Sequence, residues 1–91
     1  MTEKHVMYEY LLDCLTGLEN REECELFLQD LCTYAEIENM AQRLWSAKLI
    51  LEGKTYAQVA EETQISSATL SRVSRCIKHG GGGYRAVIEK N

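Results

Sequence analysis

The 91-residue sequence contains no proline, and its six glycines stand only at positions 17, 53 and 80–83. Because proline and glycine interrupt helices more strongly than other residues, long helices can run between these few points. No segment shows the regular apolar alternation of a half-buried strand. The sequence therefore predicts an all-α chain whose turns are confined to short segments.

The sequence also lacks the spacing of a metal site. Its four cysteines form no Cys-x-x-Cys pair, and no histidine lies at ligand spacing from any of them. Cys14, Cys24 and Cys32 fall on apolar helical faces, as expected for reduced core residues in the cytosol. His5 and His79 have no carboxylate and nucleophile at a spacing that indicates catalysis. We therefore predict neither a metal site nor an enzyme.

No apolar run is long enough to span a membrane, and no N-terminal segment resembles a signal peptide. We therefore expect a cytoplasmic protein with no membrane partner. The length indicates one domain, and a helical chain this short buries only a modest core by itself. We therefore expect the chain to assemble with a partner chain.

The net charge of −4 is divided unevenly along the chain. Residues 1–52 carry four Lys or Arg against eleven Asp or Glu, a net charge of −7, whereas residues 53–91 carry six against three, a net charge of +3. Basic surfaces favour contact with the phosphates of nucleic acid. We expect the second part of the chain to meet a polyanion and the first to form an acidic, solvated scaffold.

Residues 53–79 have the pattern of a helix-turn-helix. Gly53 can end a long helix in the left-handed conformation, and Thr55 with Gln58 three residues later forms a capping box for the next helix. Ile65 is the single apolar residue between two polar stretches, which predicts a buried anchor in the turn. The alternative, a helix pair that merely packs in a core, would not need this polarity.

The second helix of the motif begins at a cap formed by Ser66 or Ser67, and Leu70, Val73 and Ile77 recur on its inner face at helical spacing. The opposite face carries short or basic side chains that can approach a DNA major groove. We expect Lys54, Gln58 and Arg75 to contact the DNA backbone and the others to lie at or near the bases. The predicted DNA-binding residues are Lys54, Gln58, Ser66, Ser67, Ala68, Thr69, Ser71, Arg72 and Arg75.

Three helices are predicted before the motif, over about residues 3–16, from Asn20 onwards, and from Thr33 to about residue 52. Asn20 and Thr33 are each followed by a glutamate three residues later, which is typical of a capped helix start. After the motif, the glycines at 80–83 end the helix, and residues 84–90 form one more short helix.

The third helix is apolar over more than half of its circumference, which implies a second partner surface. Trp45, Leu49 and Ile50 fall off its main stripe. The main stripe consists of Ile37, Met40, Ala41, Leu44, Ala47, Lys48 and Leu51.

Five stretches carry a resemblance to a known family: Asp-Leu-Cys-Thr (30–33), Met-Ala-Gln-Arg-Leu (40–44), Ala-Lys-Leu-Ile-Leu-Glu-Gly-Lys-Thr-Tyr (47–56), Ala-Thr-Leu-Ser-Arg (68–72) and Gly-Gly-Tyr (82–84). Six helices are predicted, and the fourth and fifth form the motif. In this respect too the sequence resembles the Trp repressor family, most closely its small YerC/YecD-type Trp-repressor-like members. The resemblance covers nearly the whole chain.

The resemblance implies a six-helix Trp-repressor-like fold in a single domain, 1–91. Within it, residues 1–52 would be dimerisation helices, 53–79 the helix-turn-helix, and 80–91 a glycine linker and C-terminal helix. It also implies an intertwined homodimer that offers two motifs to adjacent major-groove segments, so that the operator is roughly palindromic.

Repressors of this family hold tryptophan between two arginines, with a threonine near the ligand carboxylate. The matching positions are Arg43, Arg72 and Thr33, which the resemblance marks as candidate ligand-binding residues. Val73 stands where the repressor has a glycine beside the indole, and its methyl groups would occupy space that the ligand needs. An ordinary ion pair between Arg43 and a helix glutamate is the favoured alternative. We therefore expect no cofactor, and Val73 disfavours L-tryptophan as a corepressor.

Together these features predict a sequence-specific DNA-binding transcriptional regulator, of the repressor kind, that reads double-stranded DNA as a homodimer. The alternative is a protein–protein interaction module that uses the helical dimer surface. The two differ in salt dependence, because DNA affinity falls steeply with added salt and apolar contacts do not.

Overall fold

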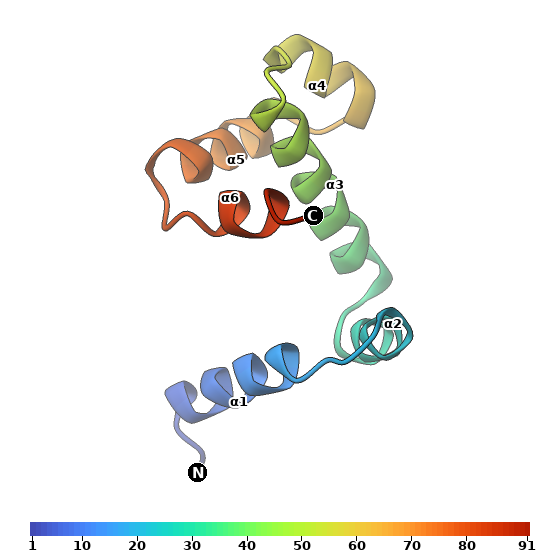
Figure 1. Cartoon of the computed structure of the whole chain (residues 1–91), viewed down its shortest axis with the longest axis vertical. Helices are drawn as coiled ribbons and strands as arrows, with labels where there is room; N and C mark the ends of the chain where they lie inside the picture. The colour runs from blue at the N-terminus through green and yellow to red at the C-terminus, as the bar shows by residue number, and fades with distance from the viewer. The chain divides into compact units, whose positions relative to one another are not determined.

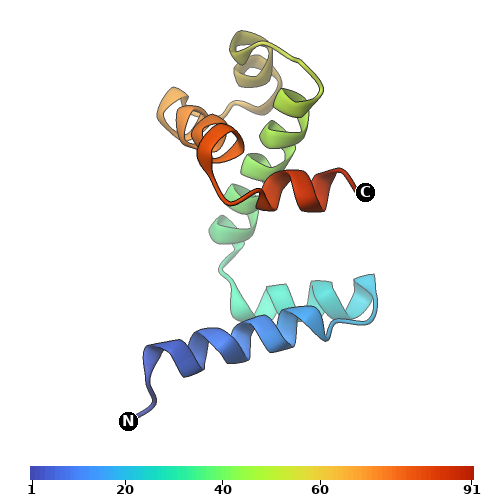
Figure 2. The same cartoon turned by 60° about the vertical axis from the view of Figure 1, so that its left-hand side comes forward.

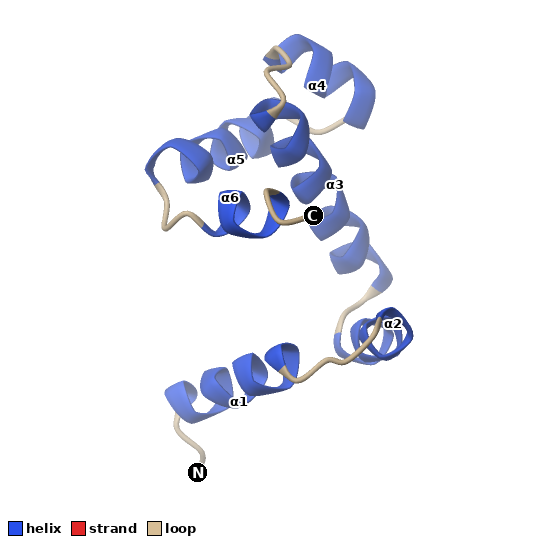
Figure 3. Cartoon of the chain, viewed as in Figure 1, coloured by secondary structure: helices blue, strands red, loops and turns tan.

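The computed structural model describes all 91 residues and contains six α-helices and no strand (Figure 3). Every predicted helix is present within a few residues of its expected bounds, which confirms the all-α class. None of the helices combines the length and apolar character needed to cross a bilayer. The helices are α1 (Lys4–Thr16), α2 (Arg21–Leu31), α3 (Tyr34–Leu51), α4 (Tyr56–Thr63), α5 (Ser67–His79) and α6 (Gly83–Ile88).

The chain divides into two compact units, residues 1–34 and 35–91. The first unit contains α1 and α2, and the chain turns back between them (Figure 2). As predicted, Asn20 caps α2, since its Oδ1 accepts a hydrogen bond of 2.8 Å from the Glu23 amide. No residue of α1 or α2 is fully buried within the chain.

The three cysteines of the first unit differ from their prediction in one respect. Cys14, Cys24 and Cys32 are free thiols, as expected, but they are half-buried rather than enclosed in a core. A unit of two short helices has too few layers to enclose a side chain on all sides. The apolar faces of α1 and α2 are therefore only partly covered within one chain.

The second unit is built on α3, and the helices α4, α5 and α6 lie around the C-terminal half of α3 (Figure 1). Fully burying a Val, Leu or Ile side chain stabilises a fold by about 1.5–3 kcal/mol. Because the buried residues come from α3, α4, the turn and α5, this cluster holds the helix-turn-helix against α3. Its six buried apolar members are Ala47, Leu49, Val59, Ile65, Leu70 and Val73.

The face of α3 that enters this core includes only part of the predicted stripe. Leu49, predicted to lie off the stripe, is 3% exposed, whereas Leu44, predicted to lie on it, is 45% exposed. Ser46 and Ala47 are fully buried. The reason is that α4 and α5 cover the side of α3 that carries Ser46 and Leu49. Helical spacing reveals both apolar sides of α3, but it does not tell which one the same chain covers.

Gly53 ends α3 as predicted, with a φ of +93° in the left-handed region. The Gly53 amide donates to the Ile50 carbonyl at 3.0 Å, and the Lys54 amide donates to the Leu49 carbonyl at 3.1 Å. No heavy atom lies within 4 Å of the place where a Cβ would stand on Gly53. The backbone dihedral, and not crowding, is therefore what requires glycine here.

Gly53→Ala is expected to lower the free energy of unfolding by about 1 kcal/mol, because a Cβ strains the left-handed conformation. Gly81→Ala is the matched control, since Gly81 also has open space around it but no positive φ. Denaturant unfolding at one protein concentration measures both. An equal loss in the two variants would contradict the assignment.

Candidate nucleic-acid interface

The first helix of the motif begins at the predicted capping box. The Thr55 amide donates to Gln58 Oε1 at 2.9 Å, and the Gln58 amide donates to Thr55 Oγ1 at 3.2 Å. These two bonds satisfy backbone donors that a helix start leaves open. They also fix the direction in which α4 leaves the end of α3.

The turn between α4 and α5 contains the predicted anchor. Ile65 is 5% exposed and belongs to the core cluster. The residue before it, Gln64, has a φ of +62° and caps α4 in the left-handed conformation. The sequence did not predict this left-handed cap, since glutamine has no special preference for the left-handed region. Gln64 Nε2 donates to the Glu61 carbonyl at 2.7 Å, which satisfies one of the open carbonyls at the helix end.

The cap of α5 is Ser66, which decides between the two serines that the sequence left open. Ser66 Oγ accepts a hydrogen bond of 3.2 Å from the Thr69 amide, and Thr69 Oγ1 lies 2.9 Å from the same oxygen. Thr69 is half-buried. Its hydroxyl therefore takes part in the cap at the start of the helix.

The two faces of α5 differ sharply in burial and chemistry. On the inner face, Leu70 is 3% exposed and Val73 is 1% exposed. Two carboxylates, Glu61 and Glu62, lie on α4, whereas α5 has no acidic residue. The side chains on the solvent face of α5 are thus mostly short or basic, as predicted. The exposed side chains of α5 are Ser67, Ala68, Ser71, Arg72, Arg75, Cys76, Lys78 and His79.

Lys54 and Gln58, the two predicted backbone contacts on the α4 side, are exposed and line one shallow cavity. The other residues that line it are Glu61 and Glu62. Two carboxylates beside one ammonium repel phosphate. The electrostatics of this end of the motif are therefore less favourable to DNA than those of α5.

A second cavity, of about 440 Å³, lies between the start of α4 and α5. Tyr56 hydrogen bonds through its hydroxyl to Ser74 Oγ, and Lys78 Nζ lies 5.9 Å from the centroid of the Tyr56 ring. Ser74 is only 3% exposed, whereas Tyr56 is 44% exposed. Neither Tyr56 nor Ser74 is among the site residues predicted from the sequence. The cavity is lined by Tyr56, Ser71, Ser74, Arg75, Lys78 and His79.

The pKa of Tyr56 lies below its ordinary value. The main cause is the hydrogen bond from Ser74, and the nearby ammonium of Lys78 adds to it, although desolvation acts in the opposite direction. Both causes favour negative charge on the phenol oxygen.

The three candidate ligand-binding residues are spread over three segments. Thr33 precedes α3 in the first unit, while Arg43 lies half-buried on α3 and Arg72 is exposed on α5. Arg43 has no ion pair within the chain, in which the ion pairs are Lys48–Glu52 and Arg85–Glu89. The interpretation of Arg43 as half of a structural ion pair therefore finds no partner within one chain.

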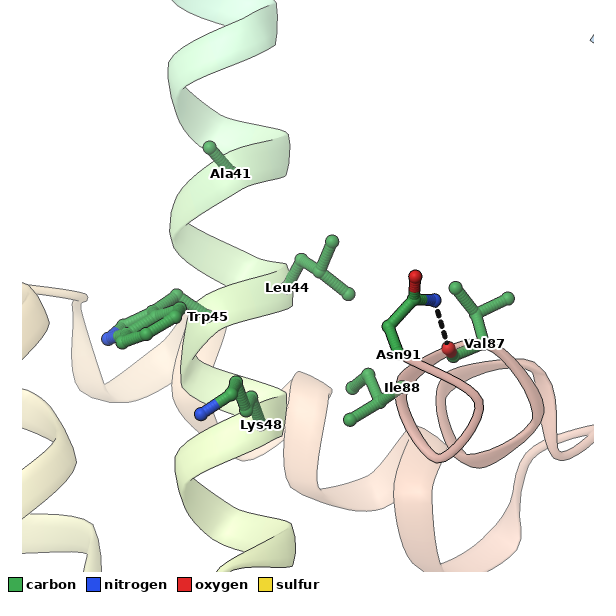
Figure 4. Close-up of a pocket in the computed structure, with 7 residues that line it drawn as sticks. All are labelled: Ala41, Leu44, Trp45, Lys48, Val87, Ile88 and Asn91. Atoms are coloured by element: carbon green, nitrogen blue, oxygen red, sulfur yellow. Dashed lines mark hydrogen bonds between the residues drawn. The ribbon is translucent and has the colours of Figure 1, made fainter. Parts of the chain in front are cut away.

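An apolar groove of about 460 Å³ lies between α3 and α6. Figure 4 shows Leu44 of α3 pointing toward Val87 and Ile88 of α6. Leu44, Trp45 and Val87 are each about half exposed, at 45%, 46% and 51%. Lys48 Nζ lies 4.6 Å from the centroid of the Trp45 ring. On α3 this groove is lined by Ala41, Leu44 and Lys48 of the predicted main stripe, together with Trp45.

In an absorbance titration, one tyrosine step is expected below the ordinary pKa of a phenol, and Tyr56→Phe is expected to remove that step. Ser74→Ala should move the step toward higher pH, because the main cause of the lowered pKa is lost. Ser71→Ala, in the same cavity, is the control and should leave it in place. A step unaffected by Ser74→Ala would contradict the geometry.

The model of the Trp repressor protein family matches residues 7–91. The uncharacterized protein YerC of Bacillus subtilis is 40% identical over 82 residues, which cover 90% of this chain and 79% of YerC. A crystal structure of a candidate Trp repressor from Staphylococcus aureus is 42% identical, with a TM-score of 0.89 over 93% of this chain and 85% of that one. A TrpR-like protein from Eubacterium eligens is 38% identical, with a TM-score of 0.90 over 96% and 90% of the two chains. The chain therefore belongs to the Trp repressor family.

Proposed function

We propose that this protein is a sequence-specific DNA-binding transcriptional regulator that acts in the cytoplasm as a homodimer on a roughly palindromic operator. The observation that carries the proposal is the two-sided character of α5. Leu70 and Val73 fix one face in the core, and the opposite face offers hydroxyls, an alanine and arginines to solvent. A helix held in this way has the shape and charge that a major groove accepts.

The contacts divide along α5 according to side-chain reach. Ser67, Ala68 and Ser71 are short enough to let the helix approach the groove floor, and Arg72 reaches a guanine edge. Arg75, one turn further along, lies beside the cavity of Tyr56 and Lys78 and would meet a phosphate. The hydroxyl of Tyr56 would donate to the same phosphate group.

The proposal of a homodimer is supported by the apolar surface that remains exposed in a single chain. The groove between α3 and α6 exposes Leu44, Trp45 and Val87, and α1 exposes Met7 and Tyr8 to at least half of their areas. Exposed apolar clusters of this kind mark interaction surfaces. A second copy of the chain that covers them would also supply the second reading helix that a palindrome requires.

We infer that no small-molecule corepressor is needed. Val73 is packed in the core cluster, at the position where the resemblance to tryptophan-binding repressors implies a glycine. Its side chain fills space and holds α5 against the rest of the unit. With that space filled, the protein concentration, rather than tryptophan, would set occupancy of the operator.

Selection of bound sites from a random duplex library, with and without tryptophan, tests the function. We expect one palindromic sequence to be enriched equally under both conditions. Enrichment only with tryptophan would overturn the inference on the corepressor. No enrichment under either condition would favour the protein–protein interaction module.

Arg72→Ala is expected to weaken binding to the selected duplex by about 1–3 kcal/mol and to relax the base preference at one position, because a bidentate base contact is lost. The matched control is Arg85→Ala, which removes an exposed arginine on α6 that pairs with Glu89. A gel-shift series with the selected and the single-mismatch duplexes measures both effects. Unchanged affinity for Arg72→Ala would reject the assigned role.

Lys78→Ala is expected to weaken binding to all duplexes alike and to reduce the slope of log affinity against log salt by about 1, because one phosphate contact is lost. Lys90→Ala, an exposed lysine beyond α6, should leave the slope unchanged. Fluorescence anisotropy at four salt concentrations gives the slope. Equal slopes for Lys78→Ala and the wild-type protein would exclude the contact.

A further inference from the structure

The end of α4 is tied to α3 by a small network of hydrogen bonds. Gln42 Nε2, on α3, donates to the carbonyl oxygen of Thr63 at 2.9 Å. Ser46 Oγ, one turn along α3, donates to Thr63 Oγ1 at 3.3 Å. Thr63 is the last residue of α4, and its carbonyl is one of those that a helix end leaves without an internal partner. A side chain from 21 residues earlier supplies the missing donor.

Thr63 Oγ1 makes two further bonds that reach the turn. It donates to the Val59 carbonyl at 2.7 Å, and it accepts a hydrogen bond from the Ile65 amide at 3.3 Å. Ile65 follows the left-handed Gln64 and is followed by Ser66, the cap of α5. The network therefore runs from α3 to Ile65, the residue before the cap of the reading helix.

The burial of Ser46 makes this network costly to break. Ser46 is 0% exposed, and each buried side-chain polar atom of the chain has a hydrogen-bond partner. If the partner of Ser46 were lost, a buried hydroxyl would be left unpaired, which costs more than the net gain of an average bond. The arrangement in which Ser46 meets Thr63 is thus favoured over any in which α4 slides along α3.

We propose that Gln42, Ser46 and Thr63 are positioning residues that set the turn, and with it the start of α5, relative to α3 without a small molecule. Apolar burial supplies most of the stability of this unit, but it is non-directional. Hydrogen bonds depend on distance and angle, so they select one register among several that bury similar area. The inference rests on the proposed function and adds the device that keeps α5 in its reading position.

Thr63→Val is the direct test, because valine keeps the shape of threonine and removes the hydroxyl. We expect the affinity for the best-enriched duplex of the random library to fall roughly three- to tenfold, the range for loss of one or two hydrogen bonds. Thr63→Ser retains the hydroxyl and should bind as the wild type does. Gln42→Met, which removes the other donor from α3, should weaken binding in the same direction.

Two controls separate positioning from a general loss of stability. Thr16→Val removes a hydroxyl that also donates to the carbonyl four residues earlier, at 2.8 Å, but that lies at the end of α1. Ile50→Val trims a side chain packed against the core cluster without touching the network, and it should lower the melting temperature but not the DNA affinity.

Amide hydrogen exchange of the free protein provides a readout that does not depend on DNA. The Ile65 amide should exchange faster in Thr63→Val than in Ile50→Val, since only the former loses its acceptor. If Thr63→Val binds the duplex as tightly as Ile50→Val does, the positioning role is overturned while the proposed function stands. If the wild-type protein binds no duplex at all, the proposed function fails. Independently of DNA, equal exchange rates of the Ile65 amide in Thr63→Val and Ile50→Val would reject the network.

Discussion

The burial of Val73 and Leu70 on one side of α5 is the constraint on which the reading surface depends. Both side chains lie in one cluster with Ala47 of α3 and Val59 of α4, so α5 cannot rotate about its axis without exposing them. Burying side chains of this size is worth a few kcal/mol in total, which is much of the stability of a small helical unit. Rotation is thereby prevented, and the hydroxylated and basic face of the helix remains outside.

Rotation about the axis is only one degree of freedom, and the polar contacts restrict the others. At one end, Thr63 links the turn to α3, and at the other, the hydroxyl of Tyr56 bonds to Ser74. The end of α4 is thus bonded to α3 and its start to α5, by hydrogen bonds that have a preferred geometry. The proposed phosphate contacts use the same Tyr56 and its neighbour Lys78, so the fastening and the proposed binding site share residues.

Much of the motif could be predicted from the sequence because its signals are local. The two residues of the capping box, Thr55 and Gln58, lie three positions apart, and the stripe of Leu70, Val73 and Ile77 follows the helical period. The family was recognised from five short stretches, and the match over residues 7–91 confirms it. The bonds of Gln42 to Thr63 and of Tyr56 to Ser74 join residues 21 and 18 positions apart, and no local pattern reveals them. For the same reason the sequence did not reveal which apolar side of α3 the chain itself covers.

The most direct test of the central claim, that the outer face of α5 is the surface that meets DNA, is a map of backbone amide shifts on addition of the selected duplex to the ¹⁵N-labelled protein. The largest changes should fall on Ser67, Ala68, Ser71 and Arg72, with a second group at Tyr56 and Arg75. Changes confined to Leu44, Trp45 and Val87, the residues of the groove between α3 and α6, would contradict it.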